Sequence, residues 1–131
     1  MRLRASLAVA ALLTLTTTVP AAAARSEEPA SDRGLFLTVS GSENTWIRGV
    51  ALSCPPAPDA RHPHAATACA ALVAVSGDLD RLPRDPHLCT KEYDPVTVTA
   101  TGAWDGRPVT WRKTFPSACE ADTLTGPVFR F

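Results

Sequence analysis

Three stretches of the chain place aliphatic residues at every second position, a pattern typical of strands with one buried face. The first runs from Leu35 to Ser40. The turn residues Gly41–Asn44 follow, and a second strand is expected from about Thr45 to Cys54. The strongest signal runs from Val96 to Thr101, where aliphatic residues alternate with threonines. We therefore expect three strands in these positions.

Two further strands are expected in the C-terminal third of the chain. The pair Asp105-Gly106 is typical of a tight hairpin turn and predicts a partner strand through Val109–Phe115. Trp104, beside that turn, is expected to be exposed or to lie at a subunit contact. A last short strand is expected at Val128–Phe131, which brings the predicted sheet to five antiparallel strands.

One longer and one short helix complete the expected fold. Four prolines exclude regular structure over most of residues 54–66. After them, Thr67 is a suitable N-cap and Gly77 a suitable helix end. The residues between them that share one helical face are Cys69, Leu72, Val73 and Ser76. Residues 117–123 can form one more helical turn. The sequence thus predicts an α+β domain with a five-stranded antiparallel sheet and two helices.

The first 24 residues have the pattern of a signal peptide. Arg2 and Arg4 form a positive start, residues 7–15 an apolar stretch too short to span a bilayer, and Ala22–Ala24 a small-residue cleavage site. We expect residues 1–24 to be removed and the mature protein to be secreted.

Composition narrows the function of residues 25–131, which the length places in one domain. The full chain carries 13 basic and 13 acidic side chains, so its formal net charge is zero. This balance lacks the excess of basic residues that is typical of proteins that bind nucleic acid, and it gives no polybasic patch for a membrane surface. No cofactor is expected, and the expected partners are proteins.

Four cysteines remain after the signal peptide, at positions 54, 69, 89 and 119. An even number in an exported chain predicts two disulfides, for which three connectivities are possible. Local spacing favours Cys54–Cys69 and Cys89–Cys119. A zinc site is a weak alternative because the chain has no Cys-x-x-Cys pair. We expect no metal.

The candidate chemistry lies in a long loop from Leu82 to Tyr93, which contains two prolines and has no periodicity. A cysteine that can form a disulfide, Cys89, and Pro95 flank a single lysine, Lys91. Such a loop can enter a protease active site in an extended form, and prior rigidity lowers the entropy lost on docking. Lys91 would fill the primary pocket of a trypsin-like enzyme, and Lys91–Glu92 would be the bond attacked. Taken alone, Lys91 is more typical of a solvated surface lysine than of a reactive-site residue.

The chain does not have the residues of an enzyme. All three histidines, His62, His64 and His87, lie in proline-rich loops. Ser76 does not have the sequence context of the sharp turn that exposes a nucleophilic serine. His62 and His64 could bind a metal as a pair, but no third ligand is in view, so we expect a surface loop. No catalytic residue is predicted.

The sequence also resembles the Streptomyces subtilisin inhibitor family of secreted serine protease inhibitors. The resemblance covers about residues 35–131 and is most specific in the loop Cys89–Val96 and in the four-cysteine spacing. The supporting pieces are Leu52-Ser53-Cys54, His62-Pro63, Ala68-Cys69-Ala70, Gly77-Asp78-Leu79, Cys119-Glu120 and Val128-Phe129-Arg130-Phe131.

The resemblance implies a homodimer, a five-stranded sheet with two helices, and disulfides within the first and the second cysteine pair. It places Lys91 before the scissile bond, which goes with inhibition of both trypsin-like and subtilisin-like enzymes. It also places Ser117 where the family often has an asparagine that supports the loop. In such an inhibitor Cys89 and Thr90 would contact the enzyme as an added strand segment, and Tyr93 would pack on the far side of the bond.

An alternative from another class remains: a secreted interaction module without inhibitory activity, or a cell-surface substrate of a processing or cross-linking enzyme. Such a protein would share the fold and the export signal, but it would not need a rigid loop.

Overall fold

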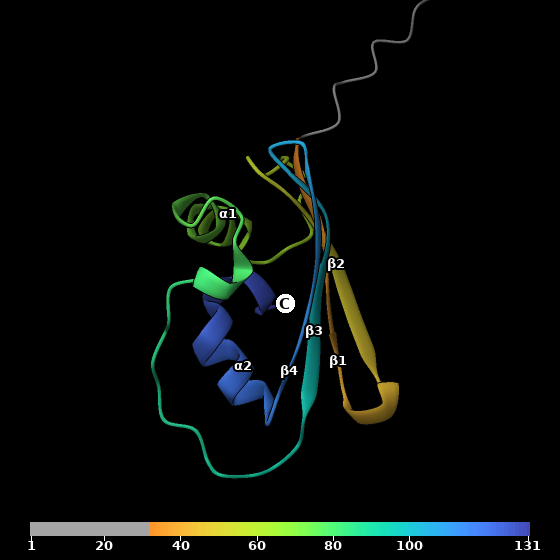
Figure 1. Ribbon diagram of the computed structural model, residues 1–131, viewed down its shortest axis with the longest axis vertical. Helices are drawn as coiled ribbons and strands as arrows, with labels where there is room; N and C mark the ends of the chain where they lie inside the picture. Colours follow the sequence, from red (N-terminus) through yellow and green to blue (C-terminus); the bar gives the residue numbers. More distant parts are fainter. Residues whose placement is uncertain (1–31) are drawn as a thin grey trace, which may run out of the picture.

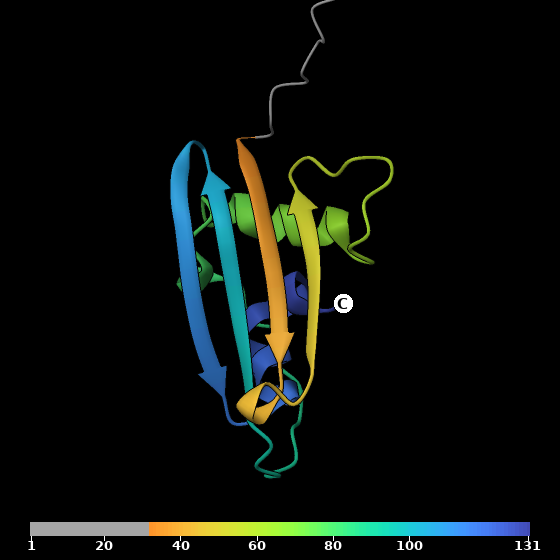
Figure 2. The ribbon, with the colours of Figure 1, turned by 90° about the vertical axis from the view of Figure 1, so that its right-hand side faces the viewer.

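A four-stranded antiparallel sheet forms one layer of the protein, and the helices form the other (Figure 1). The computed structural model describes residues 32–131, so the predicted signal peptide and the start of the predicted domain lie outside the described residues. The strands are β1 (Arg33–Ser40), β2 (Ile47–Ser53), β3 (Val96–Trp104) and β4 (Arg107–Phe115). Their order across the sheet is β2-β1-β3-β4 (Figure 2).

Both α-helices lie on the same side of the sheet (Figure 1). They are α1 (Ala65–Ala74) and α2 (Ala118–Thr125), and three 3-10 segments accompany them: η1 (Ser42–Asn44), η2 (Leu79–Arg81) and η3 (Gly126–Phe129). Among residues 32–131, no helix has the length and apolar character needed to cross a membrane.

The predicted fifth strand is wrong. Its first two residues, Val128 and Phe129, belong to η3, and both are buried. A strand would turn these neighbouring side chains to opposite faces, whereas the tight turn of η3 packs them between α1 and α2. Pro127 has no N–H to donate to a ladder, and Gly126 takes a positive φ of 56°. The structure therefore has four strands.

The alternating pattern correctly predicts which face of the sheet is buried. In β1, Leu35 and Leu37 lie under the helices while Phe36 is 52% exposed on the other face. In β3, Val96, Val98 and Ala100 are all buried. The opposite face carries the threonines, including Thr38 and Thr99, whose hydroxyl groups are hydrogen-bonded across β1 and β3.

The start of α1 is set by His62 rather than by Thr67. The His62 ring is buried, its Nε2–H donates to the carbonyl of Val128 (2.8 Å), and its Nδ1 accepts the backbone N–H of His64 (3.0 Å). The helix therefore begins at Ala65, and the expected surface position of His62 is wrong. Buried polar rings require hydrogen-bond partners, and both ring nitrogens of His62 have one.

Trp104 is a second correction, because it is buried rather than exposed or at a subunit contact. Its ring lies against Gly77, where a Cβ atom would come within 2.4 Å of the Trp104 Cγ. Gly77 has a φ of +77°, a conformation that residues with a side chain rarely adopt. The chain thus leaves α1 through a glycine that both the backbone and the neighbouring ring require.

Replacing Gly77 with alanine should lower the free energy of unfolding by roughly 2–5 kcal/mol, from backbone strain and overpacking together. The control is Gly106→Ala: Gly106 has a similar φ of +73°, but a Cβ there meets nothing within 4 Å. Strain alone, roughly 1–2 kcal/mol, should remain in that variant. Urea unfolding of both variants measures the difference, and equal losses would show that the Trp104 contact has no effect.

Candidate functional site: the 82–95 loop

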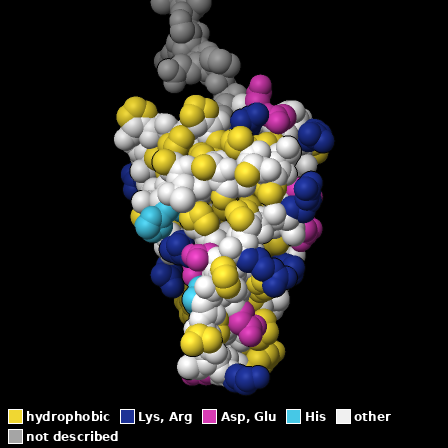
Figure 3. Space-filling view, turned by 90° about the vertical axis from the view of Figure 1, so that its left-hand side faces the viewer, with side chains coloured by type: hydrophobic (Ala, Val, Ile, Leu, Met, Phe, Trp, Pro, Cys, Tyr) yellow, Lys and Arg dark blue, Asp and Glu magenta, His cyan; other side chains and the backbone are white. Residues whose placement is uncertain are grey.

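Residues 82–95 form one long loop between η2 and β3, here called the 82–95 loop. It passes along α2 and turns at the end of the molecule where β3 begins (Figures 1 and 2). Leu82 is buried at its start, while residues 83–88 and 90–94 are exposed. In the space-filling view, this part of the molecule is the narrow end (Figure 3).

The predicted contact residues stand together at the outer part of this loop. Thr90, Lys91 and Glu92 are exposed, Tyr93 is 78% exposed, and Cys89 is half-buried. Within residues 32–131, no hydrogen bond or ion pair holds the side chains of Lys91 or Glu92. These side chains are therefore fully available to a partner.

Two disulfides join the cysteines as local spacing predicted. Cys54 is bonded to Cys69 of α1, and Cys89 is bonded to Cys119 of α2. The second bond fixes the 82–95 loop two residues before Lys91. It also brings His87 close to the two sulfur atoms, but cysteines in a disulfide have no thiolate to offer a metal ion.

Backbone hydrogen bonds fix the loop on both sides of its outer part. On the first side, the N–H of Asp85 donates to the carbonyl of Thr123 (2.9 Å). On the second side, the N–H of Asp94 donates to the carbonyl of Pro116 (3.0 Å). The Ser42 hydroxyl donates to the Pro95 carbonyl (3.3 Å) just beyond. Residues 90–93 thus span two fixed points.

Ser117 acts on α2 rather than on the loop. Its Oγ accepts the backbone N–H of Glu120 (3.2 Å), which makes it the N-cap of the helix. A cavity of about 200 Å³ separates this helix start from the loop and is lined by Thr90, Glu92, Asp94, Ser117, Ala118 and Cys119. The outer part of the loop is therefore held from its ends and not from beneath.

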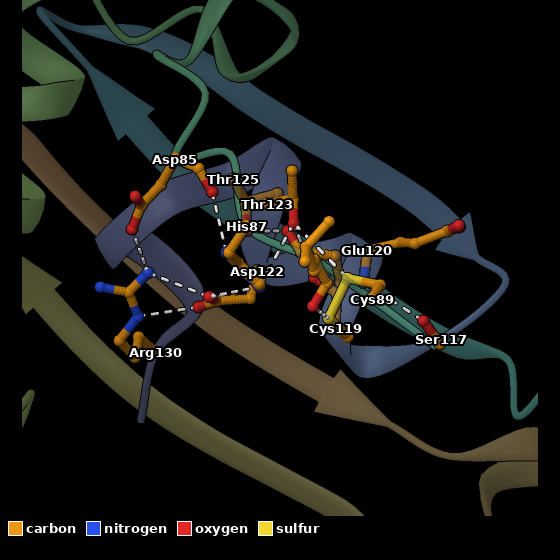
Figure 4. Close-up of polar contacts among 12 residues, drawn as sticks. Asp85, His87, Cys89, Ser117, Cys119, Glu120, Asp122, Thr123, Thr125 and Arg130 are labelled. Atoms are coloured by element: carbon orange, nitrogen blue, oxygen red, sulfur yellow. Dashed lines mark hydrogen bonds and ion pairs between the residues drawn. A yellow bond between two sulfur atoms is a disulfide. The ribbon is translucent and has the colours of Figure 1, made fainter. Parts of the chain in front are cut away.

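A network of charged residues that sequence reasoning did not predict lies on the inner side of the loop (Figure 4). Arg130 pairs with Asp122 of α2 (Nε–Oδ1, 2.7 Å) and with Asp85 of the loop (Nη2–Oδ2, 2.8 Å). The hydrogen bonds that Arg130 donates to Asp122 and then to Asp85 raise the pKa of Arg130 above its ordinary value. Asp85 lies 45 residues before Arg130 in the sequence, so no local motif reveals the network. Leu88, a fully exposed apolar residue, was also missed, although an isolated leucine beside a loop cysteine is a visible signal.

Comparison with known proteins identifies the family to which this loop belongs. A sequence profile of the family described as subtilisin inhibitor-like matches residues 29–117. The chain belongs to this family. It is therefore a member of a family of protease inhibitors and not an enzyme, as the absence of a predicted catalytic residue led us to expect.

Individual relatives support the assignment over most of the chain. Subtilisin inhibitor-like protein 5 of Streptomyces fradiae is 43% identical over 74% of this chain and 95% of its own length. The subtilisin inhibitor of Streptomyces violaceus is 40% identical over 89% of this chain and 88% of its own. Kexstatin-1 of Streptomyces platensis is 38% identical over 93% and 92%.

A solved relative shares the fold. The structure of Streptomyces caespitosus sermetstatin in complex with Bacillus licheniformis subtilisin matches with a TM-score of 0.58 at 35% identity. The match covers 75% of this chain and 96% of the sermetstatin chain. It supports the antiparallel α+β fold described above.

Removing the Cys89–Cys119 bond by a double serine substitution should loosen the loop selectively. Its bonded residues are 30 apart in the sequence, and the model of lost chain entropy gives roughly 3–4 kcal/mol of stability for such a bond. Cleavage of the variant at Lys91 by a lysine-specific metalloprotease should be much faster than cleavage of the wild type.

The matched control is the same double substitution at Cys54 and Cys69, whose sequence separation is 15. It should lower stability by a comparable amount while the peptide bonds at Lys91 stay protected, at temperatures where both variants are folded. Equal protection in the two variants would contradict a local role for the second disulfide.

Proposed function

We propose that this protein is a secreted inhibitor of serine endopeptidases that docks the 82–95 loop like a substrate, with Lys91–Glu92 as the bond presented. The observation that carries the proposal is the contrast within the loop. Residues 90–93 are exposed, while Cys89 and Asp94 on either side are fixed to the rest of the protein.

Fixed ends give the loop two advantages as an inhibitor. A segment already held in place loses less conformational entropy on docking, so more of the contact energy appears as affinity. After cleavage at Lys91–Glu92, the disulfide would keep the first new end in position and the Asp94–Pro116 hydrogen bond would keep the second. The ends can then rejoin, because neither can diffuse from the active site.

Five residues of the loop have a proposed contact in the enzyme. Lys91 would enter the primary pocket, where the aspartate of a trypsin-like enzyme could pair with its ammonium group. Cys89 and Thr90 would run along the enzyme as an added strand segment, and Tyr93 would pack beyond the bond. Leu88 adds an apolar contact three residues before Lys91.

Subtilisin-type enzymes are the first proposed targets because the related sermetstatin is known in complex with a subtilisin. Trypsin-type enzymes are the second, because a basic residue stands before the proposed bond. Secretion follows from the predicted signal peptide of residues 1–24, which leaves a domain at residues 25–131. Two disulfides fit an oxidising compartment outside the cell.

Replacing Lys91 with alanine should weaken trypsin inhibition roughly 10- to 100-fold, because a charge-assisted contact in the pocket is lost. Subtilisin inhibition should change much less. The control is Lys113→Ala, which removes the other lysine of the chain, on β4, and should leave both inhibition constants unchanged.

Titration of both enzymes with purified wild type and variants measures these constants. Equal losses for trypsin and subtilisin in Lys91→Ala would remove Lys91 from its proposed role. Rapid cuts of the wild type after Arg84, Lys91 and Arg112 by catalytic trypsin would instead favour the non-inhibitory alternative.

We also propose that the protein is a homodimer formed through the open face of the sheet. This face is not covered by any element of residues 32–131 (Figure 2). It carries exposed apolar side chains, Phe36 and Ile47, beside rows of threonines on β3 and β4. Phe36 lies over Gly49, where an added Cβ would approach its ring within 2.8 Å. A weakly charged sheet face with exposed apolar side chains suits contact with a second copy.

Phe36→Glu should therefore shift the protein from dimer to monomer, because a carboxylate would be buried without a partner at the interface. The control is Val73→Glu: Val73 is 50% exposed, close to the 52% of Phe36, but lies on α1 on the other side of the sheet. Sedimentation equilibrium measures the mass of both variants. A dimer that survives Phe36→Glu, or a monomeric wild type, would contradict the proposal.

A further inference from the structure

We infer that Arg130 is a positioning residue for the 82–95 loop, one that holds the first half of the loop against α2 by pairing with Asp85 and Asp122 together. The inference that this position matters for inhibition rests on the proposed function. The contact itself does not, and the two can be tested separately.

The geometry of the guanidinium group supports this role (Figure 4). Arg130 donates to both oxygens of Asp122, from Nε to Oδ1 at 2.7 Å and from Nη2 to Oδ2 at 3.0 Å. The same Nη2 donates to Oδ2 of Asp85 at 2.8 Å. Charge-assisted, two-pronged contacts of this kind fix direction as well as distance. Asp122 therefore orients the guanidinium, and the oriented group in turn holds the loop.

Other contacts continue the attachment along the loop. Beyond the bond from the N–H of Asp85 to Thr123, a ring nitrogen of His87 lies 2.9 Å from the Asp85 carbonyl. The other ring nitrogen lies 3.3 Å from the Thr123 hydroxyl and 3.6 Å from Asp122. Four residues after Asp85, Cys89 is bonded to Cys119. The loop thus follows α2 in the opposite direction, from Thr123 at one attachment to Cys119 at the next.

These attachments need each other to define the direction of the loop. The disulfide fixes one point, and a segment fixed at one point can still swing about it. Asp85 is the second point, held by its backbone bond to Thr123 and by Arg130 together, and the line between the two points sets the direction in which residues 90–93 leave α2. The effect on overall stability should be small, because the side chains of Arg130 and Asp85 are 39% and 56% exposed.

An arginine suits this position better than a lysine would. A guanidinium group presents several N–H groups in one plane and can pair with two carboxylates at once, whereas an ammonium group is a point charge. Arg130→Lys should therefore restore only part of what Arg130→Met loses. If only the positive charge mattered, Arg130→Lys would restore all of the loss. Partial rescue therefore indicates that the shape of the guanidinium group positions the loop.

The test compares Arg130→Met with Arg81→Met, which removes the same charge from an exposed residue at the end of η2 that has no ion pair among the described residues. Hydrogen exchange by mass spectrometry on the full protein reports the motion of amides 85–91. In Arg130→Met their exchange should rise roughly two- to fivefold, the range expected for loss of a partly exposed ion pair. Arg81→Met should match the wild type.

The same variants are then tested as inhibitors of subtilisin. Arg130→Met should raise the inhibition constant and the rate of cleavage at Lys91–Glu92 by a similar roughly two- to fivefold factor. Asp85→Asn should have the same effect, and the double variant should be no worse than either single one. Thermal unfolding should shift little in any of them.

The inference is overturned if exchange of amides 85–91 is equal in Arg130→Met and Arg81→Met, or if the effects of Arg130→Met and Asp85→Asn are fully additive. If the wild type fails to inhibit subtilisin while the exchange result holds, the proposed function fails and the positioning contact stands. If inhibition is strong but unchanged in Arg130→Met, the contact has no role in inhibition and the inference is wrong.

Discussion

Helix α2 is only eight residues long, yet the loop residues Asp85, Cys89 and Asp94 are attached to it or to the residue just before its N-cap. An isolated helix of this length is not stable in water, so α2 depends on its cap and its packing. Ser117 caps its start, and Ala121 and Thr125 are buried against the sheet side of the molecule. The position of the loop is therefore set by how well this one short helix is held on the sheet.

The protein combines a firm base with an outer segment that has almost no contacts of its own. The base consists of a disulfide, backbone hydrogen bonds and the Arg130 network, all on the inner side of the loop. The outer residues keep their polar backbone groups in contact with solvent, so their exposure carries no penalty for unpaired buried groups. One set of residues thus holds the loop in place, and a different set is exposed to a partner, so the loop is both fixed and accessible.

The parts of the fold that could be predicted from the sequence are those governed by local rules. Alternation located β1 and β3, Asp105-Gly106 located the hairpin, and local spacing paired the cysteines. The errors arose where tertiary packing overrode a local pattern. Val128 and Phe129 are β-forming residues, but both are buried between helices, and Trp104 is covered because Gly77 leaves room for its ring.

The candidate site shows the same division. Lys91 and its neighbours could be identified because the cysteine and the proline lie within a few residues of it. Arg130 and Asp85 could not, since they are 45 residues apart and only the folded chain brings them together. His62 was missed for a similar reason: its partner, the Val128 carbonyl, lies 66 residues away.

Because the side chains of Lys91 and Glu92 take no part in holding the protein together, natural variation at these two positions can proceed without endangering folding. A lineage of such proteins could exchange the residue at position 91 by a single codon change and meet a new enzyme with an unchanged scaffold. Substitution is not tolerated in the same way at positions 85, 119 and 122, because a change there would move residues 90–93 themselves. Sequence differences among relatives should accordingly be concentrated at positions 91 and 92 and be rare at positions 85, 119 and 122.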